Sequence, residues 1–232
     1  GFSNPKAVAA TVRGWHHGRY RATRSTRAKE MLTELVPTLL RSLGATAQPD
    51  SAFLRFDEFL GKLPAGVQLF SMFHINPALM GLVAEIMGDA PRLAEILSRR
   101  PNMLDAVLTP GFFDQPPGRD VLGADLDALL ANTSSDYEEA LDILRLWANG
   151  HKFQVGVQTL RHLLDAREAG EALTAIADVV IGRLLKATEE EFAATYGRVP
   201  GGGMVVIAMG KMGGREMTAT SDLDLITVYD AE

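Results

Sequence analysis

The stretch MVVIAMGKMGGREMTATSDLDLITVY, residues 204–229, differs in pattern from everything before it. Its first six residues form a continuous apolar run rich in β-branched side chains, which is typical of a strand buried on both faces. Gly213 and Gly214 follow, and DLDLITVY predicts a second strand from Asp222. We expect the order strand, glycine turn leading into a short helix near Met217, and strand.

Two aspartates at the start of this second strand are candidate ligands. Because side chains alternate between the faces of a strand, Asp222 and Asp224 should share one face, while Leu223 and Leu225 point into a core. Two like charges favour a bound cation, and Mg²⁺ is commonly held by one or two carboxylates together with substrate phosphates. The pair therefore predicts a magnesium site, with a solvated strand edge as the alternative, because D-x-D is a common pattern.

The glycine segment before the aspartates suits a triphosphate. Gly213 and Gly214 let backbone N–H groups approach phosphates closely, and Lys211 and Arg215 supply cations beside them. The segment is not a Walker loop, because Met212 follows the lysine where Ser or Thr is required, and it lacks G-x-G-x-x-G spacing. An ordinary turn is the alternative interpretation.

The first 200 residues are predicted to be helical. NPKAVAATVRGW and NPALMGLVAEIM each begin with Asn and Pro, which predicts an N-cap and a preset first turn. Ser135 and Glu138 have capping-box spacing before an apolar pattern of helical period, which predicts one long helix from about 135 to about 166. A second long helix ends before Gly197 and pairs with it as an antiparallel hairpin. Shorter helices are expected near 25–43, 50–61, 65–74, 77–87, 91–99 and 101–108.

The composition is that of a soluble globular protein, with 232 residues, 47% apolar and 22% charged. The absence of cysteine excludes disulfides, thiolate-held metals and a cysteine nucleophile, and it favours a cytoplasmic setting. No apolar run approaches the ~20 residues needed to cross a bilayer, so we expect no membrane partner. Because the chain begins with Gly1 rather than methionine, we expect a fragment of a longer protein.

The formal net charge of -6 is unevenly distributed. Residues 1–29 contain seven basic and no acidic side chains. Such an arm occurs in transit peptides and in nucleic-acid-binding segments. We favour docking on an acidic surface of the same or a neighbouring domain, and therefore expect no nucleic-acid partner. The histidines lack metal-ligand spacing to carboxylates and are expected to be structural.

The segment TPGFFDQPPGRD predicts a loop between subdomains, because three prolines and two glycines fall within twelve residues. We divide the chain into a helical connecting region over 1–115, a long-helix hairpin over 116–199 and the beginning of an α/β domain over 200–232. The expected fold class is mainly α, an irregular helical bundle followed by the first strands of a truncated α/β domain.

The segment GKMGGREMTATSDLDLI resembles the nucleotidyltransferase signature of the bacterial glutamine synthetase adenylyltransferase family. GWHHGRYRATRSTRAKEMLTELVPTLL, LPAGVQLFSMFHINPAL and HKFQVGVQTL resemble the helical region before that family's C-terminal catalytic domain. The resemblance implies that 200–232 begins a polymerase-β-like nucleotidyltransferase domain. It also implies transfer of AMP from ATP to a tyrosine of glutamine synthetase, under control of PII protein and glutamine, with AMP removed by a related N-terminal half.

The family motif also implies residue roles. Gly213 and Gly214 would hold the triphosphate, Ser221 would lie beside the phosphates, and Asp222 and Asp224 would bind Mg²⁺ and catalyse transfer. Two Mg²⁺ ions would stabilise the attacking and leaving oxygens, and a third carboxylate on a later strand would deprotonate the tyrosine. We therefore expect this chain alone to be inactive.

Two departures from the family pattern are small. Met212 stands where leucine is usual, and Gly-Gly replaces the Gly-Ser of the wider superfamily.

Two other functions are alternatives to the one that the resemblance implies. One is another nucleotidyltransferase, acting on a small molecule or an RNA end, and the other is a non-enzymatic helical module with a regulatory or interaction role.

Overall fold

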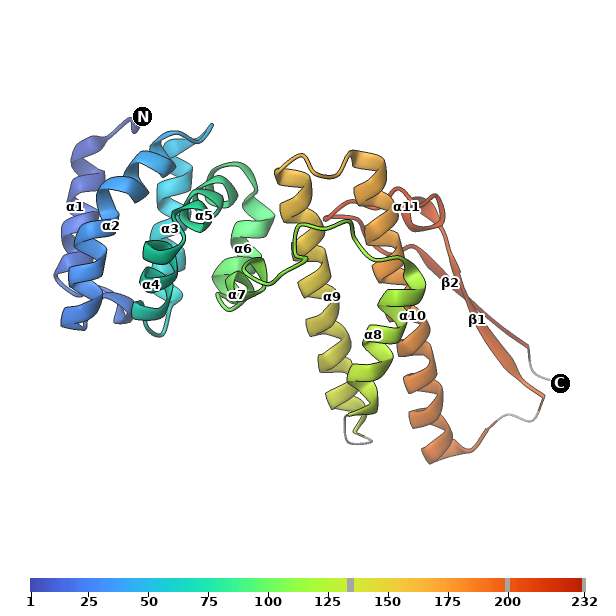
Figure 1. Cartoon of the computed structure of the whole chain (residues 1–232). Coiled ribbons are helices and arrows are strands. Elements are labelled where there is room, and N and C mark those ends of the chain that lie inside the picture. The colour runs from blue at the N-terminus through green and yellow to red at the C-terminus, as the bar shows by residue number, and fades with distance from the viewer. Residues whose placement is uncertain (133–135, 199–200, 231–232) are drawn as a thin grey trace. The chain divides into compact units, whose positions relative to one another are not determined.

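The computed structural model describes residues 1–132, 136–198 and 201–230 (Figure 1). It consists of two compact units, Gly1–Leu108 and Thr109–Glu232. Helices make up most of the described chain, and its strands form one antiparallel pair near the C-terminus. The expected fold class, mainly α with the first strands of an α/β domain, is confirmed. The functional division at 115 and 199 stays a prediction.

The first unit is a bundle of short helices whose starts are often set by proline. Asn-Pro begins both α1 and α5, but only Asn4 caps its helix, with its side chain accepting the Ala7 N–H at 3.1 Å. Asn76 makes no side-chain cap bond, so the capping expectation is wrong there. The elements are α1 (Pro5–His16), η1 (Arg21–Thr23), α2 (Thr26–Gly44), α3 (Pro49–Lys62), α4 (Val67–Ile75), α5 (Pro77–Asp89), α6 (Pro91–Arg99) and α7 (Met103–Val107).

One carboxylate ties the basic N-terminal segment to α3. The buried Trp15 ring stacks on Phe53, with ring centroids 5.4 Å apart, and its Nε1–H donates to Asp57 Oδ1 at 2.7 Å. The Tyr20 hydroxyl donates to Asp57 Oδ2 at 3.0 Å. Burial raises the pKa of Tyr20 above its ordinary value, and the hydrogen bond to Asp57 adds to that rise.

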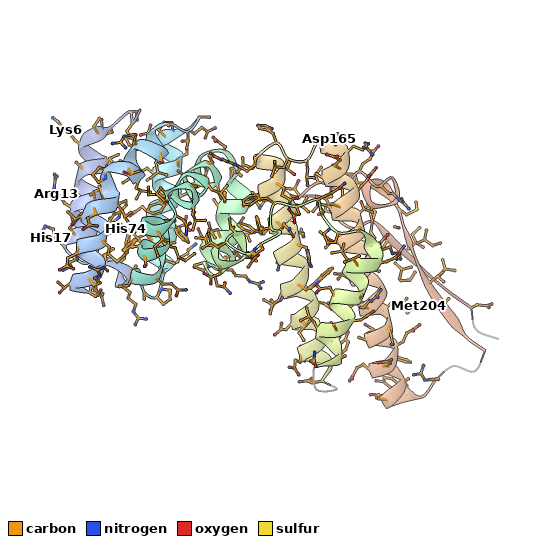
Figure 2. All side chains as sticks on the ribbon, viewed as in Figure 1. Lys6, Arg13, His17, His74, Asp165 and Met204 are labelled. Atoms are coloured by element: carbon orange, nitrogen blue, oxygen red, sulfur yellow. The ribbon has the colours of Figure 1, made fainter. Side chains whose placement is uncertain are left out.

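The basic arm presents an exposed face. Lys6, Arg13 and His17 lie along one side of α1 and point away from the rest of the unit (Figure 2). Among the described residues, Lys6 and Arg13 form no ion pair, so docking of this arm on an acidic surface stays a prediction.

In the described part of the chain, no single helix has the length and apolar character to cross a bilayer, whereas α4 and α5 meet that test only jointly, across a bend of 113°.

The second unit is built on three helices, α8 (Arg119–Ala131), α9 (Tyr137–Leu160) and α10 (Ala166–Tyr196). As Figure 1 shows, α9 and α10 run antiparallel, as predicted. The predicted helix over 135–166 is too long, because the chain turns at His162, with φ 57°, and Asp165 and Glu168 form a capping box that starts α10. Ser135 lies outside the described residues, and Asp136 caps α9 by accepting the Glu138 N–H at 3.1 Å.

Strands β1 (Gly203–Ala208) and β2 (Leu225–Asp230) form a two-stranded antiparallel sheet, with Gly203 opposite Asp230 and Ala208 opposite Leu225. Helix α11 (Gly210–Gly213) lies between them. Two expectations are wrong here: β2 begins after the aspartates, and the short helix precedes the glycine turn. The first strand, β1, is also not buried on both faces, since Val205 is 57% and Ile207 45% exposed. Among the described residues, every residue of β2 is exposed and β1 alternates between exposed and half-buried positions, so the sheet lacks a full covering layer.

Candidate functional site

The segment between β1 and β2 is fixed to the helices by two methionines. Met212 and Met217 are 3% and 8% exposed and belong to a hydrophobic cluster with apolar side chains of α8, α9 and α10. Ala208, at the end of β1, packs partly buried against the same cluster. The predicted site therefore lies on the helical core at the inner end of the strand pair.

A glycine on α10 allows close contact between backbones. A Cβ atom on Gly170 would lie 3.2 Å from the carbonyl oxygen of Arg215 and 3.3 Å from both Glu216 Cα and the Met217 carbonyl oxygen. Such distances are tighter than ordinary van der Waals contact, so the loop backbone rests where a side chain would otherwise be.

Helix α11 ends in a Schellman motif that positions two cations. The Arg215 N–H donates to the Met212 carbonyl at 3.1 Å, and the Glu216 N–H donates to the Lys211 carbonyl at 2.8 Å. Arg215 adopts φ 60° at the position where glycine is usual. Lys211 and Arg215 are both exposed, and among the described residues neither forms an ion pair.

The glycines of the predicted phosphate site have different constraints. A Cβ on Gly213 would lie 2.7 Å from the Ala208 carbonyl oxygen, so only glycine fits there without a shift. Gly214 has more room, with its nearest atom, the Gly210 carbonyl oxygen, 3.5 Å from such a Cβ. Their N–H groups donate to Met209 and Gly210 carbonyls at 2.9 and 3.0 Å, respectively. In this conformation, Gly213 thus lets the Ala208 carbonyl approach closely, and the N–H groups of both glycines are already used within the turn.

Asp222 and Asp224 lie in the extended segment before β2, and both are exposed. The Asp224 carbonyl accepts the Met209 N–H at 2.8 Å, and the Asp224 carboxylate lies against Gly210, at φ 52°, where an added Cβ would collide with it. The structure thus brings Asp224 to the start of the glycine turn. The expectation of a buried Leu223 and Leu225 is wrong, because these side chains are 47% and 39% exposed.

Ser221 closes the turn that leads to the aspartates. Its N–H donates to the Thr218 carbonyl at 3.1 Å, and its Oγ accepts the Thr218 N–H at 2.8 Å. The hydroxyl is therefore held in place by the loop itself. Within the described ranges, no group of three or more His, Asp or Glu side chains could together hold a metal ion.

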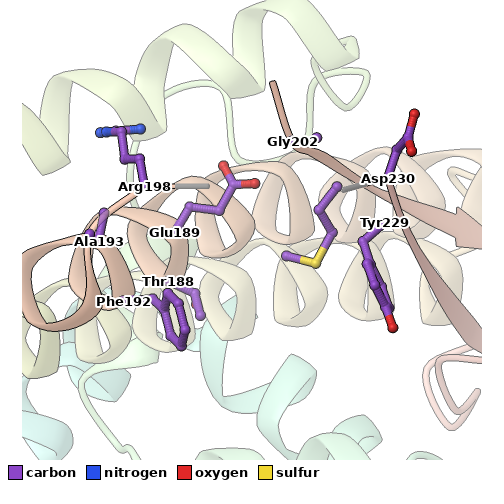
Figure 3. A pocket seen from close by; sticks show the side chains of 11 residues that line it. Thr188, Glu189, Phe192, Ala193, Arg198, Gly202, Tyr229 and Asp230 are labelled. Atoms are coloured by element: carbon purple, nitrogen blue, oxygen red, sulfur yellow. The ribbon is translucent and has the colours of Figure 1, made fainter. Parts of the chain in front are cut away.

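An apolar cleft lies elsewhere in this unit, between the last turns of α10 and the outer ends of the strands (Figure 3). Its volume is about 590 Å³, and its described lining includes Phe192, Met204 and Tyr229. None of the predicted site residues lines it. The cleft and the predicted nucleotide site are therefore separate places.

Sequence reasoning missed the residues that support the site. Gly170, Met212 and Met217 were not assigned to the attachment of the loop. A glycine inside a helical pattern, which costs helix stability relative to alanine, is the signal that points to Gly170. The role of the methionines has no local signal, because their partners are distant in sequence.

Residues 80–232 match the family model described as glutamate-ammonia ligase adenylyltransferase. Curated relatives named bifunctional glutamine synthetase adenylyltransferase/adenylyl-removing enzyme are 49% identical in Mesorhizobium japonicum and 46% in Rhizobium meliloti, each over 230 residues, or 99% of this chain. The relative from Caulobacter vibrioides is 43% identical over 232 residues, or 100% of the chain. In each case the chain spans 23% of the relative's length. Because the family model covers most of the chain, including the glycine turn and both aspartates, the chain belongs to the glutamate-ammonia ligase adenylyltransferase family.

Proposed function

We propose that this chain is the part of a glutamine synthetase adenylyltransferase in which a helical region meets a nucleotidyltransferase domain. The complete enzyme would transfer AMP from ATP to a tyrosine of glutamine synthetase. The names of the relatives support this activity. The observation that carries the proposal is the meeting of the Asp224 carboxylate with the glycine turn at Gly210, on a loop anchored by Met212 and Met217.

The donor chemistry fits Mg²⁺. Asp222 and Asp224 are exposed, and among the described residues neither forms an ion pair, so both carboxylates are available to a hard cation. We assign Mg²⁺ to these two aspartates, with phosphate oxygens of ATP supplying further ligands. The ion would supply neutralisation of the charge on the triphosphate.

The remaining residues of the loop would bind the nucleotide. Lys211 and Arg215 both belong to the Schellman motif, are exposed, and would face the phosphates as cations. Gly213 and Gly214 would hold the triphosphate, and Ser221 would lie next to the phosphates. Arg215 keeps its positive φ because the loop is anchored on both sides of it.

A third carboxylate, from sequence outside residues 1–232, would take the proton of the attacking tyrosine. We therefore propose that the 232-residue chain does not catalyse transfer alone. PII protein and glutamine as regulators rest on the family resemblance, and a cytoplasmic location rests on the absence of cysteine.

The site assignment is tested by charge removal in the longer enzyme. Asp222→Asn and Asp224→Asn should each reduce incorporation of radiolabelled AMP into glutamine synthetase to background, because each removes a Mg²⁺-binding charge. Glu190→Gln, which removes an exposed carboxylate from α10, is the matched control and should retain transfer. Wild-type transfer by either aspartate variant would disprove the assignment.

The acceptor is tested separately. Glutamine synthetase whose acceptor tyrosine is replaced by phenylalanine should receive no label, because the attacking hydroxyl is gone. Label appearing instead on RNA ends or on a small molecule would favour a different nucleotidyltransferase.

A further inference from the structure

Helix α10 contacts the loop formed by residues 209–217, which we call the glycine loop. Gly170 meets the backbone of residues 215–217, where the chain leaves α11 with Arg215 at φ 60°. Met212 precedes this contact and Met217 ends it, and both side chains are buried in the helical cluster. The glycine loop is thus held at three points, two through side chains and one through backbone.

We propose that Gly170 is a positioning residue for the nucleotide site, because the absence of a side chain at this position sets the distance between the glycine loop and α10. This inference rests on the proposed function, because it takes Lys211, Arg215 and Asp224 as the groups that bind Mg²⁺ and ATP. Gly170 itself touches no substrate. It acts by leaving out the one side chain that would hold the backbone of residues 215–217 away from the helix.

A displacement at Gly170 reaches the proposed ligands through a series of hydrogen bonds and contacts. Moving residues 215 and 216 strains the hydrogen bonds from Arg215 to Met212 and from Glu216 to Lys211, which close the Schellman motif. The same short helix begins at Gly210, against which the Asp224 carboxylate rests. A shift of the turn therefore moves both cations and the carboxylate relative to one another.

A larger side chain at position 170 should displace the glycine loop further and reduce activity more. Alanine at position 170 would place its Cβ 3.2–3.3 Å from three backbone atoms, so the loop has to move by a few tenths of an ångström. Valine adds two further methyl groups and requires a larger shift. A misplacement of about 1 Å in a site can reduce rate by about 10²-fold. We expect kcat/KM for ATP to fall several-fold in Gly170→Ala and by roughly 10²-fold in Gly170→Val, with a raised KM for ATP.

Gly182 provides the matched control on the same helix. It is exposed, and a Cβ there would meet no atom within 4 Å. Gly182→Ala and Gly182→Val therefore repeat the same changes of side chain and helix propensity without touching the glycine loop. Any effect common to both positions reflects the helix, and only the excess at position 170 reflects the loop.

Two measurements test the proposal. Amide hydrogen exchange in the 232-residue chain should become faster over residues 209–224 in both Gly170 variants and stay unchanged in the Gly182 variants. Steady-state kinetics in the longer enzyme should show the raised KM for ATP in the Gly170 variants alone. Circular dichroism checks that each variant is folded, and Gly170→Ala decides the test if Gly170→Val does not fold.

Three results would overturn the proposal. The first is unchanged exchange over 209–224 in a folded Gly170 variant, and the second is equal effects at positions 170 and 182. The third is faster loop exchange with unchanged ATP kinetics. Failure of the proposed function is a different outcome, in which Asp222→Asn and Asp224→Asn retain AMP transfer whatever the exchange of the loop.

Discussion

Side chains of the same type are buried to different extents in the helices of Gly1–Leu108 and in the strand pair β1–β2. Ile86 of α5 is fully buried, whereas Ile207 of β1 is 45% exposed. On the same face of the sheet, Val205, Ile226 and Val228 are also exposed, at 57%, 49% and 45%. The helices supply their own second layer, whereas among the described residues β2 is exposed throughout and β1 is half-buried only at alternate positions. An apolar run therefore predicts burial only where the chain also provides the opposing layer.

The largest effect on unfolding free energy is expected when isoleucine is replaced by alanine at one buried and at one exposed position. Ile86→Ala should lower the free energy of unfolding by about 2–5 kcal/mol, because it leaves a cavity in a packed core. Ile207→Ala should cost less than about 1 kcal/mol, because its side chain is half exposed. Denaturant unfolding followed by circular dichroism measures both. Equal losses would mean that the exposed face of the sheet is covered in solution.

A smaller loss of unfolding free energy is expected where hydrogen bonds to one carboxylate, rather than apolar contacts, hold a segment in place. Asp57→Ala leaves Trp15 Nε1–H and the Tyr20 hydroxyl without their acceptor in a partly buried place, which should cost about 1–3 kcal/mol. The neighbouring Glu58→Ala breaks only an exposed ion pair with Lys62 and should cost no more than about 1 kcal/mol. The same unfolding experiment compares them. A loss for Glu58→Ala that matches that for Asp57→Ala would contradict the role of this link.

The two Asn-Pro helix starts provide a finer test. Asn4→Ala should destabilise the first unit by roughly 1 kcal/mol, because the side chain caps α1 through the Ala7 N–H. Asn76→Ala should change stability much less, because no side-chain cap bond exists before α5. Thermal unfolding of the two variants decides between them. If the two variants lose the same free energy of unfolding, the hydrogen bond from the Ala7 N–H to Asn4 contributes no stability of its own.

Local signals explain which elements were predictable. Pro49, Pro77 and Pro91 fix helix starts, so α3, α5 and α6 begin at or within one residue of the predicted positions. The end of α9 was missed because the Asp165 capping box was read as part of a continuous apolar pattern. The exposure of β1 was missed because burial depends on a covering layer, which no local pattern within the strand encodes.

The candidate site shows the same division. The glycine turn and the aspartates were identified from sequence, and the structure places Asp224 beside the turn at Gly210. The predicted start of the second strand, Asp222, was three residues too early, because β2 begins at Leu225, so the aspartates appeared to be strand residues. The contact with Gly170 was not predictable, because it joins segments more than 40 residues apart through backbone atoms. The roles of the predicted site residues stay predictions.

The smallest expected effect is a pH dependence in the helical part of the second unit. The His151 ring lies 4.3 Å from the Trp147 ring, and its Nε2 lies 3.8 Å from Asp125 Oδ2, which also accepts the Trp147 Nε1–H at 2.6 Å. Burial lowers the pKa of His151, and the Asp125 carboxylate opposes that shift only in part. The folded state therefore favours the neutral ring.

The sign of the pH effect follows from this depressed pKa. Above the ordinary histidine pKa of about 6.5, both states are neutral and the full stability is present. As the pH falls below that value, the unfolded state takes up a proton more readily, so stability decreases until the lower pKa of the folded state is passed. The slope cannot exceed about 1.4 kcal/mol per pH unit for one proton. His151→Gln should therefore reduce the loss of unfolding free energy between about pH 7.5 and 5.5, measured by hydrogen exchange in α9. Parallel curves for wild type and His151→Gln would show that protonation of this ring is not linked to the stability of the helices.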